Sequence, residues 1–123
     1  MYLSQLGQIS LTVSELARSI PFYRDVLGLH LLFEAPPNIA FFDLDGVRLM
    51  MTPPDEGQEI KNSILYFKTD DIEGGYNELA DQGVNMLGEP HLVAKMQDHD
   101  LWMTFFHDPD QNTLALMCER PKS

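Results

Sequence analysis

The beginning of the chain alternates apolar and polar positions. Ile9, Leu11 and Val13 are separated by polar residues, and a period of two predicts a strand with one packed face and one open face. Apolar residues then recur at helical spacing until Gly28, and Ser14 is a candidate cap for this helix. The pattern therefore predicts a strand followed by a helix.

A proline complicates the predicted helix. Pro21 has no amide hydrogen and would crowd the carbonyl group of Ala17. Two geometries are open: a kinked helix, or a helix whose regular part begins near Ser19 and places Pro21 in its first turn. We favour the second geometry because the first turn of a helix tolerates proline.

Short stretches of β-forming residues follow the helix. They comprise Leu29 to Glu34, Ile39 to Leu44 and Val47 to Met51. Turn-forming residues separate them, and Asp45-Gly46 is typical of a hairpin. This part of the chain therefore has the predicted order βαβββ.

The same order of elements returns in the second part of the chain. The predicted elements are a strand at Ile64 to Thr69, a helix at about Asp71 to Gln82, and strands around Val84 to Val93, Leu101 to His107 and Thr113 to Cys118. Two repeats are too few for a solenoid. We expect one domain over residues 1–123, with half one at about 6–52, a linker at 53–62 and half two at about 63–119.

Composition narrows the classes of partner. The chain has 19 acidic residues against 8 Lys and Arg, so its formal net charge is −11, which argues against binding to nucleic acid or to an acidic membrane. The charge favours solubility, and a cationic organic ligand is an alternative reason for it. Cys118 is the single cysteine and no apolar run is long enough to span a membrane, so we expect a cytoplasmic protein.

Three segments of the chain resemble the vicinal oxygen chelate superfamily, which includes glyoxalase I, extradiol dioxygenases and bleomycin resistance proteins. The segments are SELARSIPFYRDVLGL, TDDIEGGYNELADQGV and FFHDPDQNTLALM, and the likeness extends from about Leu6 to Glu119. The resemblance implies an α+β fold in which two βαβββ modules form a curved mixed sheet around a cavity. It also implies a homodimer, but it does not select a reaction.

The resemblance also places the usual metal site. In metal-dependent relatives, His, Gln or Glu residues from the first and last strands of each half hold a divalent cation, and the matching positions here are Gln8, Met50, Ile64 and Ala115. Only Gln8 offers an oxygen, and a one-residue shift that substitutes Ser63 adds too little for a hard divalent ion. We therefore predict no cofactor and no metal, except for a divalent ion at a non-standard site.

Strand alternation predicts a mostly apolar ligand-facing side with a few polar groups, as is usual for small-molecule sites. The residues expected there are Gln8, Ser10, Met50, Ile64, Tyr66, Trp102, Ala115 and Met117. A slip of one residue would exchange the two faces of a strand. For Trp102, packing in the core and forming an aromatic wall of the site are both open, because its strand has almost no polar face.

Two histidines are candidates for chemistry. His91 and His99 flank a predicted turn at residues 94–97, and a symmetric turn would place them opposite each other. Such a pair could bind a metal or transfer a proton, and the alternative is that both are surface or structural histidines without a chemical role. The leading hypothesis is a small-molecule-binding protein of the bleomycin-resistance type. The alternative is a glyoxalase- or dioxygenase-like enzyme (a lyase, isomerase or oxygenase) that uses a displaced metal site or this pair.

Overall fold

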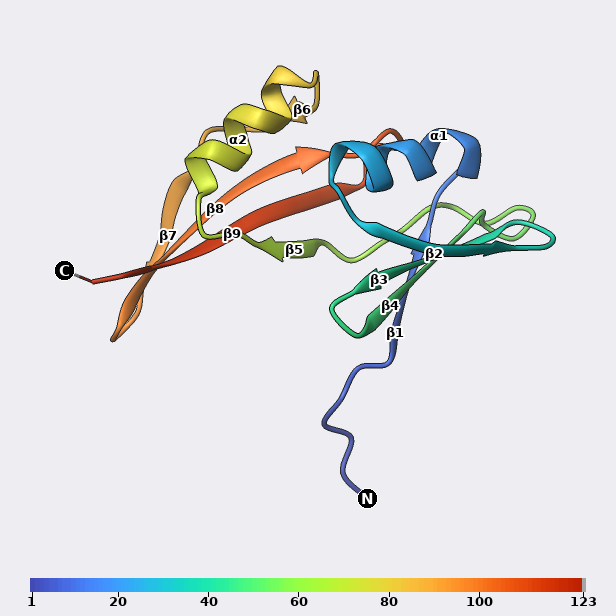
Figure 1. The fold of residues 1–123 in the computed structure, drawn as a ribbon, viewed down its shortest axis with the longest axis horizontal. Coiled ribbons are helices and arrows are strands. Elements are labelled where there is room, and N and C mark those ends of the chain that lie inside the picture. Colours follow the sequence, from blue (N-terminus) through green and yellow to red (C-terminus); the bar gives the residue numbers. More distant parts are fainter. Residues whose placement is uncertain (123) are drawn as a thin grey trace. The chain divides into compact units, whose positions relative to one another are not determined.

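The computed structural model describes residues 1–122 (Figure 1). Residue contacts divide the chain into two compact units, Met1–Asn62 and Ser63–Ser123. Each unit combines one mixed β-sheet with helical segments. The predicted α+β class is therefore confirmed. None of the helices within residues 1–122 is long and apolar enough to cross a membrane.

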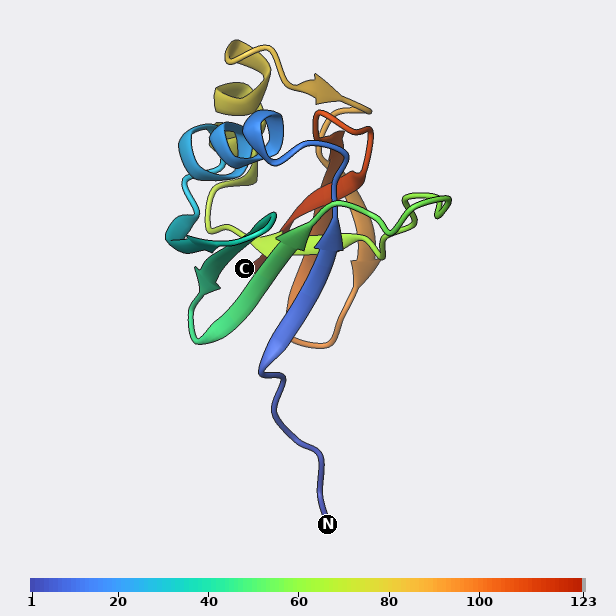
Figure 2. The same ribbon diagram turned by 90° about the vertical axis from the view of Figure 1, so that its right-hand side faces the viewer.

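The first unit contains a four-stranded sheet in the order β1-β4-β3-β2. Its strands are β1 (Gln8–Thr12), β2 (His30–Ala35), β3 (Ile39–Leu44) and β4 (Val47–Thr52). The first and last strands, β1 and β4, run parallel and side by side (Figure 2), and the other pairs are antiparallel. One face of the sheet forms a core with the helical segment, where the ring of Phe42 lies 6.3 Å from that of Tyr23 and both side chains are buried.

The helix of the first unit changes type at its proline. Helix α1 (Leu16–Pro21) continues into a π-helix, η1 (Phe22–Val26). The predicted start near Ser19 is wrong, because the amides of Arg18 and Ser19 already donate to the Glu15 carbonyl and close a turn upstream of the proline. Pro21 ends the α-helical part, and the amide of Leu27 donates to the Phe22 carbonyl in the wider π pattern.

The predicted cap of this helix is also wrong. The N-cap residue is Glu15, whose side chain makes no capping hydrogen bond. The hydroxyl of Ser14 instead accepts a hydrogen bond of 2.7 Å from the Arg18 guanidinium. The N-cap position of α1 therefore lies one residue later than the sequence suggested.

The second unit repeats this topology with one additional strand. Its elements are β5 (Leu65–Lys68), α2 (Ile72–Asp81), β6 (Asn85–Met86), β7 (His91–Lys95), β8 (His99–His107) and β9 (Thr113–Pro121). The sheet order is β5-β9-β8-β6, and β7 also pairs with β8. As in the first unit, the first and last strands, β5 and β9, are parallel.

The strand predicted at residues 84–93 is interrupted, which corrects that prediction. Between β6 and β7 the chain makes two isolated contacts with β8: the Leu87 amide donates to the Phe105 carbonyl, and the buried Thr104 hydroxyl donates to the Gly88 carbonyl at 2.8 Å. Pro90 follows and has no amide hydrogen to continue a ladder. The break divides the segment into two short edge strands.

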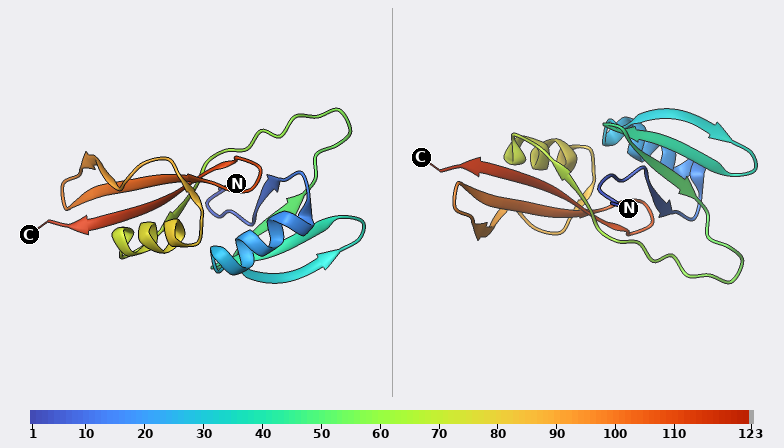
Figure 3. Two further views of the ribbon diagram at one scale, coloured as in Figure 1. Left: turned by 90° about the horizontal axis from the view of Figure 1, so that it is seen from above. Right: turned by 90° about the horizontal axis from the view of Figure 1, so that it is seen from below.

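Helix α2 covers one face of the second sheet (Figure 3). Its approach to β9 is close, because a Cβ atom added at Gly75 would lie 2.9 Å from the Leu116 side chain. The residues buried on this side include Ile72, Leu79, Thr104, Phe106, Leu114 and Cys118. The opposite face of this sheet is not covered by a helix of its own unit, so its side chains are available for contacts with other groups.

Candidate functional site

Each sheet has an open face, by which we mean the face that the helix of its own unit does not cover. Residues in direct register on neighbouring strands project to the same side of a sheet, so the strand pairing assigns each side chain to a face. Buried residues such as Phe42 and Phe106 mark the helix-covered faces. Their immediate neighbours in the strands, Phe41 and Phe105, belong to the open faces.

The first open face carries two parallel rows of side chains. The mainly apolar row is Ser10, Met50, Phe41 and Phe33, and the polar row beside it is Gln8, Arg48, Asp43 and His30. The Gln8 amide nitrogen lies 3.7 Å from the Met50 sulfur, and the Arg48 guanidinium lies 5.5 Å from the centre of the Phe41 ring. Gln8, Ser10 and Met50 therefore share one face, as strand alternation predicted.

The second open face also has two rows. One row is Tyr66, Ala115 and Phe105, and the next is Lys68, Met117, Met103 and His91. The rings of Tyr66 and Phe105 meet edge to face at 6.0 Å, and the His91 ring lies nearly parallel to that of Phe105 at 6.2 Å. Tyr66, Ala115 and Met117 share this face as predicted, and Ile64 comes one residue before β5 and is 39% exposed.

Ala115 has a particular place on the second open face. It stands in register with Tyr66 on one side and with Phe105 on the other. The rings of these two register partners meet edge to face, and Ala115 is 0% exposed although it lies on the open face, whereas Tyr66 keeps 45% of its surface exposed. At a position where the family resemblance expects a metal-binding His, Gln or Glu, the chain therefore has a small buried methyl group between two aromatic register partners.

The predicted histidine pair does not form. The Met96 amide donates to the His99 carbonyl at 2.8 Å, so the hairpin turns at residues 97–98 and not at 94–97. A bulge between Leu92 and Ala94 shifts the register further. As a result His91 lies opposite Met103, whereas His99 pairs with Pro121 on β9.

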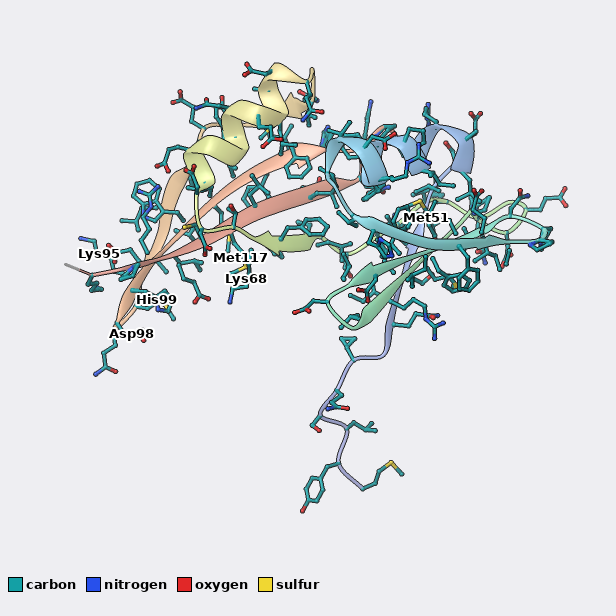
Figure 4. The ribbon with its side chains drawn as sticks, viewed as in Figure 1. Met51, Lys68, Lys95, Asp98, His99 and Met117 are labelled. Atoms are coloured by element: carbon teal, nitrogen blue, oxygen red, sulfur yellow. The ribbon has the colours of Figure 1, made fainter. Side chains whose placement is uncertain are left out.

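Each histidine has a separate local partner. A ring nitrogen of His91 lies 3.2 Å from the Glu89 carbonyl oxygen. His99 is near the tip of the hairpin, where its Nδ1 atom lies 2.8 Å from Asp98 (Figure 4) and this hydrogen bond lowers the pKa of the Asp98 carboxyl. The acid–base and metal-binding roles suggested for the pair therefore lose their geometric basis.

Trp102 lies on the side of the sheet that α2 covers, which corrects its placement in the predicted ligand-facing set. It stands opposite Cys118, and the Arg120 guanidinium lies 4.5 Å from the centre of its ring. Arg120 also forms an ion pair with Glu73 on α2. Phe105, which the prediction missed, occupies the open face instead, and because residues 101–106 are apolar on both faces, alternation gave no signal to choose between them.

The second unit also has a surface hollow. It has a volume of about 260 Å³ and is lined by Glu73, Tyr76, Asn77, Glu89 and Pro90. None of the residues predicted to bind ligand lines it. Within residues 1–122, no group of three or more His, Cys, Asp or Glu side chains is placed to hold a metal ion.

Comparison with known proteins identifies the family. The model of the glyoxalase/bleomycin resistance protein/dioxygenase superfamily matches residues 5–116. The chain belongs to this superfamily. The sequence resemblance is thus confirmed over most of the chain.

Individual members of the superfamily show how far the similarity extends. The uncharacterized protein YraH of Bacillus subtilis is 27% identical over 129 residues, covering 91% of this chain and 96% of YraH. The metallothiol transferase FosB of Staphylococcus haemolyticus is 35% identical over 88 residues, covering 67% of this chain and 63% of FosB. The chain therefore spans less than two thirds of FosB.

Solved structures show the same fold. A superfamily member from Sphaerobacter thermophilus has a TM-score of 0.79 at 20% identity, covering 95% of this chain and 98% of that one. TnmS3, an antibiotic binding protein from Streptomyces sp. CB03234, has a TM-score of 0.75 at 21% identity, covering 99% of both chains. At these identities the likeness extends to the fold alone.

Proposed function

We propose that this protein binds a small organic molecule on the second open face without the help of a divalent metal. The observation that carries the proposal is the row formed by Tyr66, Ala115 and Phe105. The family resemblance implies a metal ligand at position 115, where this chain has a buried methyl group between two aromatic register partners. Aromatic rings with exposed surface offer stacking area to an organic ligand.

The other positions at which the family resemblance implies metal ligands also support this proposal. Met50 offers a thioether, which is a poor ligand for hard cations, and Ile64 offers no donor atom. Gln8 carries the one side-chain oxygen of the set, and its amide nitrogen points to the Met50 sulfur. These residues do not fit a divalent cation, which needs several nitrogen or oxygen ligands.

The relatives offer support for two kinds of function. The name of TnmS3 describes a protein that binds an antibiotic, which is the kind of activity that we propose. The match to FosB favours an enzyme as the second candidate, since its name describes a metallothiol transferase. The two candidates differ in their need for a metal.

Metal analysis combined with calorimetric titration tests the proposal. We expect purified protein to contain far less than one equivalent of divalent metal, and to bind a neutral aromatic probe, 2-naphthamide, equally well with and without EDTA. Phe105→Ala should weaken binding by about tenfold through loss of ring contact. Trp102→Phe is the matched control, because Trp102 lies on the other face, and it should leave the affinity unchanged.

The opposite results would favour the enzyme. A stoichiometric divalent ion, or binding that disappears with EDTA and returns with added Zn²⁺ or Mn²⁺, would contradict metal-free binding. Equal loss of affinity in Trp102→Phe and Phe105→Ala would place the ligand somewhere other than the second open face.

A further inference from the structure

The second open face carries a cation beside its aromatic row. Lys68 is exposed and follows Tyr66 by two residues, so both side chains project from β5 to the same face. Lys68 stands in register with Met117, and Figure 4 shows these two side chains close together. Tyr66 and Phe105 lie in the neighbouring row. The ammonium group therefore borders a surface of rings and thioethers.

This cation has no acidic partner among residues 1–122. Lys68 is absent from every ion pair of the described chain. Two exposed carboxylates lie just beyond this row: that of Glu119, which stands opposite Leu101, and that of Asp70, which follows the end of β5. On the first open face, by contrast, Arg48 stands directly opposite Asp43.

The presence of a cation without an acidic partner on the second open face contrasts with the formal net charge of −11 of the whole chain. Acidic residues outnumber Lys and Arg by more than two to one, yet neither row of side chains on the second open face contains a carboxylate. A surface of this kind attracts a ligand of the opposite local charge, because charge complementarity acts over short distances in salt. The local pattern therefore disagrees with the cationic ligand that the net charge suggested.

We infer that the ligand of the second open face is an aromatic anion, whose rings rest against Tyr66 and Phe105 and whose carboxylate pairs with the Lys68 ammonium. This inference depends on the proposed function, since it assumes that the face binds an organic molecule. The floor for such a ligand is formed by the partly exposed side chains of Met117 and Met103. Thioether side chains adapt their shape to flat groups, and Tyr66 and Phe105 supply ring contacts.

Three probes of matched shape test the charge of the ligand: 2-naphthoate, neutral 2-naphthamide and cationic 2-naphthylmethylamine. We expect the wild-type protein to bind 2-naphthoate about three- to fivefold more tightly than 2-naphthamide, the range of a partly exposed ion pair. The cationic probe should bind most weakly. The preference for 2-naphthoate should shrink at high salt.

Substitutions of Lys68 test whether this residue causes the preference for 2-naphthoate. Lys68→Gln should remove the preference for 2-naphthoate and leave the affinity for 2-naphthamide unchanged, and Lys68→Arg should retain the preference. The matched control is Lys95→Gln, which changes the net charge equally. Lys95 lies at the end of β7 opposite Asp100 (Figure 4), and its side chain is on the face of the sheet that carries Arg120. Lys95→Gln should preserve the discrimination between probes.

Three results would overturn the inference. The first is binding of 2-naphthoate that is equal to or weaker than binding of the other two probes. The second is an identical loss of the preference for 2-naphthoate in Lys95→Gln and Lys68→Gln. The third is no binding of any probe at millimolar concentration. Metal-free binding of 2-naphthamide or the cationic probe, without a preference for the anion, would leave the proposed function intact. A requirement for added metal would overturn the proposed function itself.

Discussion

Arg120 connects three parts of the second unit. Its guanidinium pairs with the Glu73 carboxylate on α2 and lies over the ring of Trp102 on β8. The hydrogen bond from Arg120 lowers the pKa of Glu73 below its ordinary value of 4.5. Because a lowered pKa means that the folded state favours the ionised form, the contact adds stability only while Glu73 is charged.

The sign of this effect predicts how stability depends on pH. Above pH 4.5 the full contribution is present, and it is lost as the pH falls through the lowered pKa of Glu73 in the folded protein. We expect wild type to have a higher Tm than Glu73→Gln near pH 7, and the difference to narrow steadily below pH 4.5. Thermal unfolding followed by circular dichroism gives the Tm of wild type and of Glu73→Gln at each pH.

Glu78→Gln is the control, because Glu78 is an exposed residue of the same helix. Its Tm difference from wild type should not change with pH in this range. A pH-independent difference for Glu73→Gln would show that the pair with Arg120 does not contribute through charge.

The two helical segments differ in how they begin. The Asp71 carboxylate accepts a 3.0 Å hydrogen bond from the Gly74 amide at the start of α2, whereas α1 begins without a side-chain cap. A cap satisfies an amide that the helix itself cannot pair. The start of helix α2, which covers the sheet behind the second open face, is therefore held by the Asp71 side chain.

Loss of the cap should destabilise α2 measurably. We expect Asp71→Ala to lower the free energy of unfolding by about 0.5 to 2 kcal/mol, because the Gly74 amide loses its partner. Asp70→Ala changes the same charge one residue earlier and should cost less than about 0.5 kcal/mol. Urea unfolding compares the two variants, and equal losses would contradict a capping role for Asp71.

The duplication of the chain extends from topology to surface chemistry. In both units the first strand runs parallel to the last, and the helix packs on one face of the sheet. Both open faces then place an apolar row with aromatic rings beside a row that contains a cation, Arg48 in one and Lys68 in the other. The carboxylate opposite Arg48 is the main difference, so the two faces are not chemically equivalent.

The homodimer implied by the family resemblance stays a prediction for the assembled protein. Sedimentation equilibrium should give a particle of twice 14.0 kDa at micromolar concentration. A particle of 14.0 kDa over the whole concentration range would contradict it. If the dimer dissociates on dilution, titration of 2-naphthoate at protein concentrations above and below the midpoint of that dissociation would show whether binding depends on assembly.

Much of the architecture could be read from local periodicity. The alternation in residues 8–13, the β-forming stretches around Asp45-Gly46 and the repeated order of elements predicted two similar modules, and the structure contains them. The shared face of Gln8, Ser10 and Met50 and that of Tyr66, Ala115 and Met117 were also predictable. In these strands one face is clearly apolar, so a slipped register would expose the core.

Other features depend on contacts between segments that are distant in sequence. The hairpin turn at residues 97–98 is set by pairing of β7 with β8 and by a bulge, neither of which follows from residue type alone. Trp102 and Phe105 lie in a strand that is apolar on both faces, so the packing of α2 assigns Trp102 to one side and leaves Phe105 on the other. Periodicity is a local property and therefore specifies elements, whereas strand register and the face on which a side chain lies depend on which segments pack together.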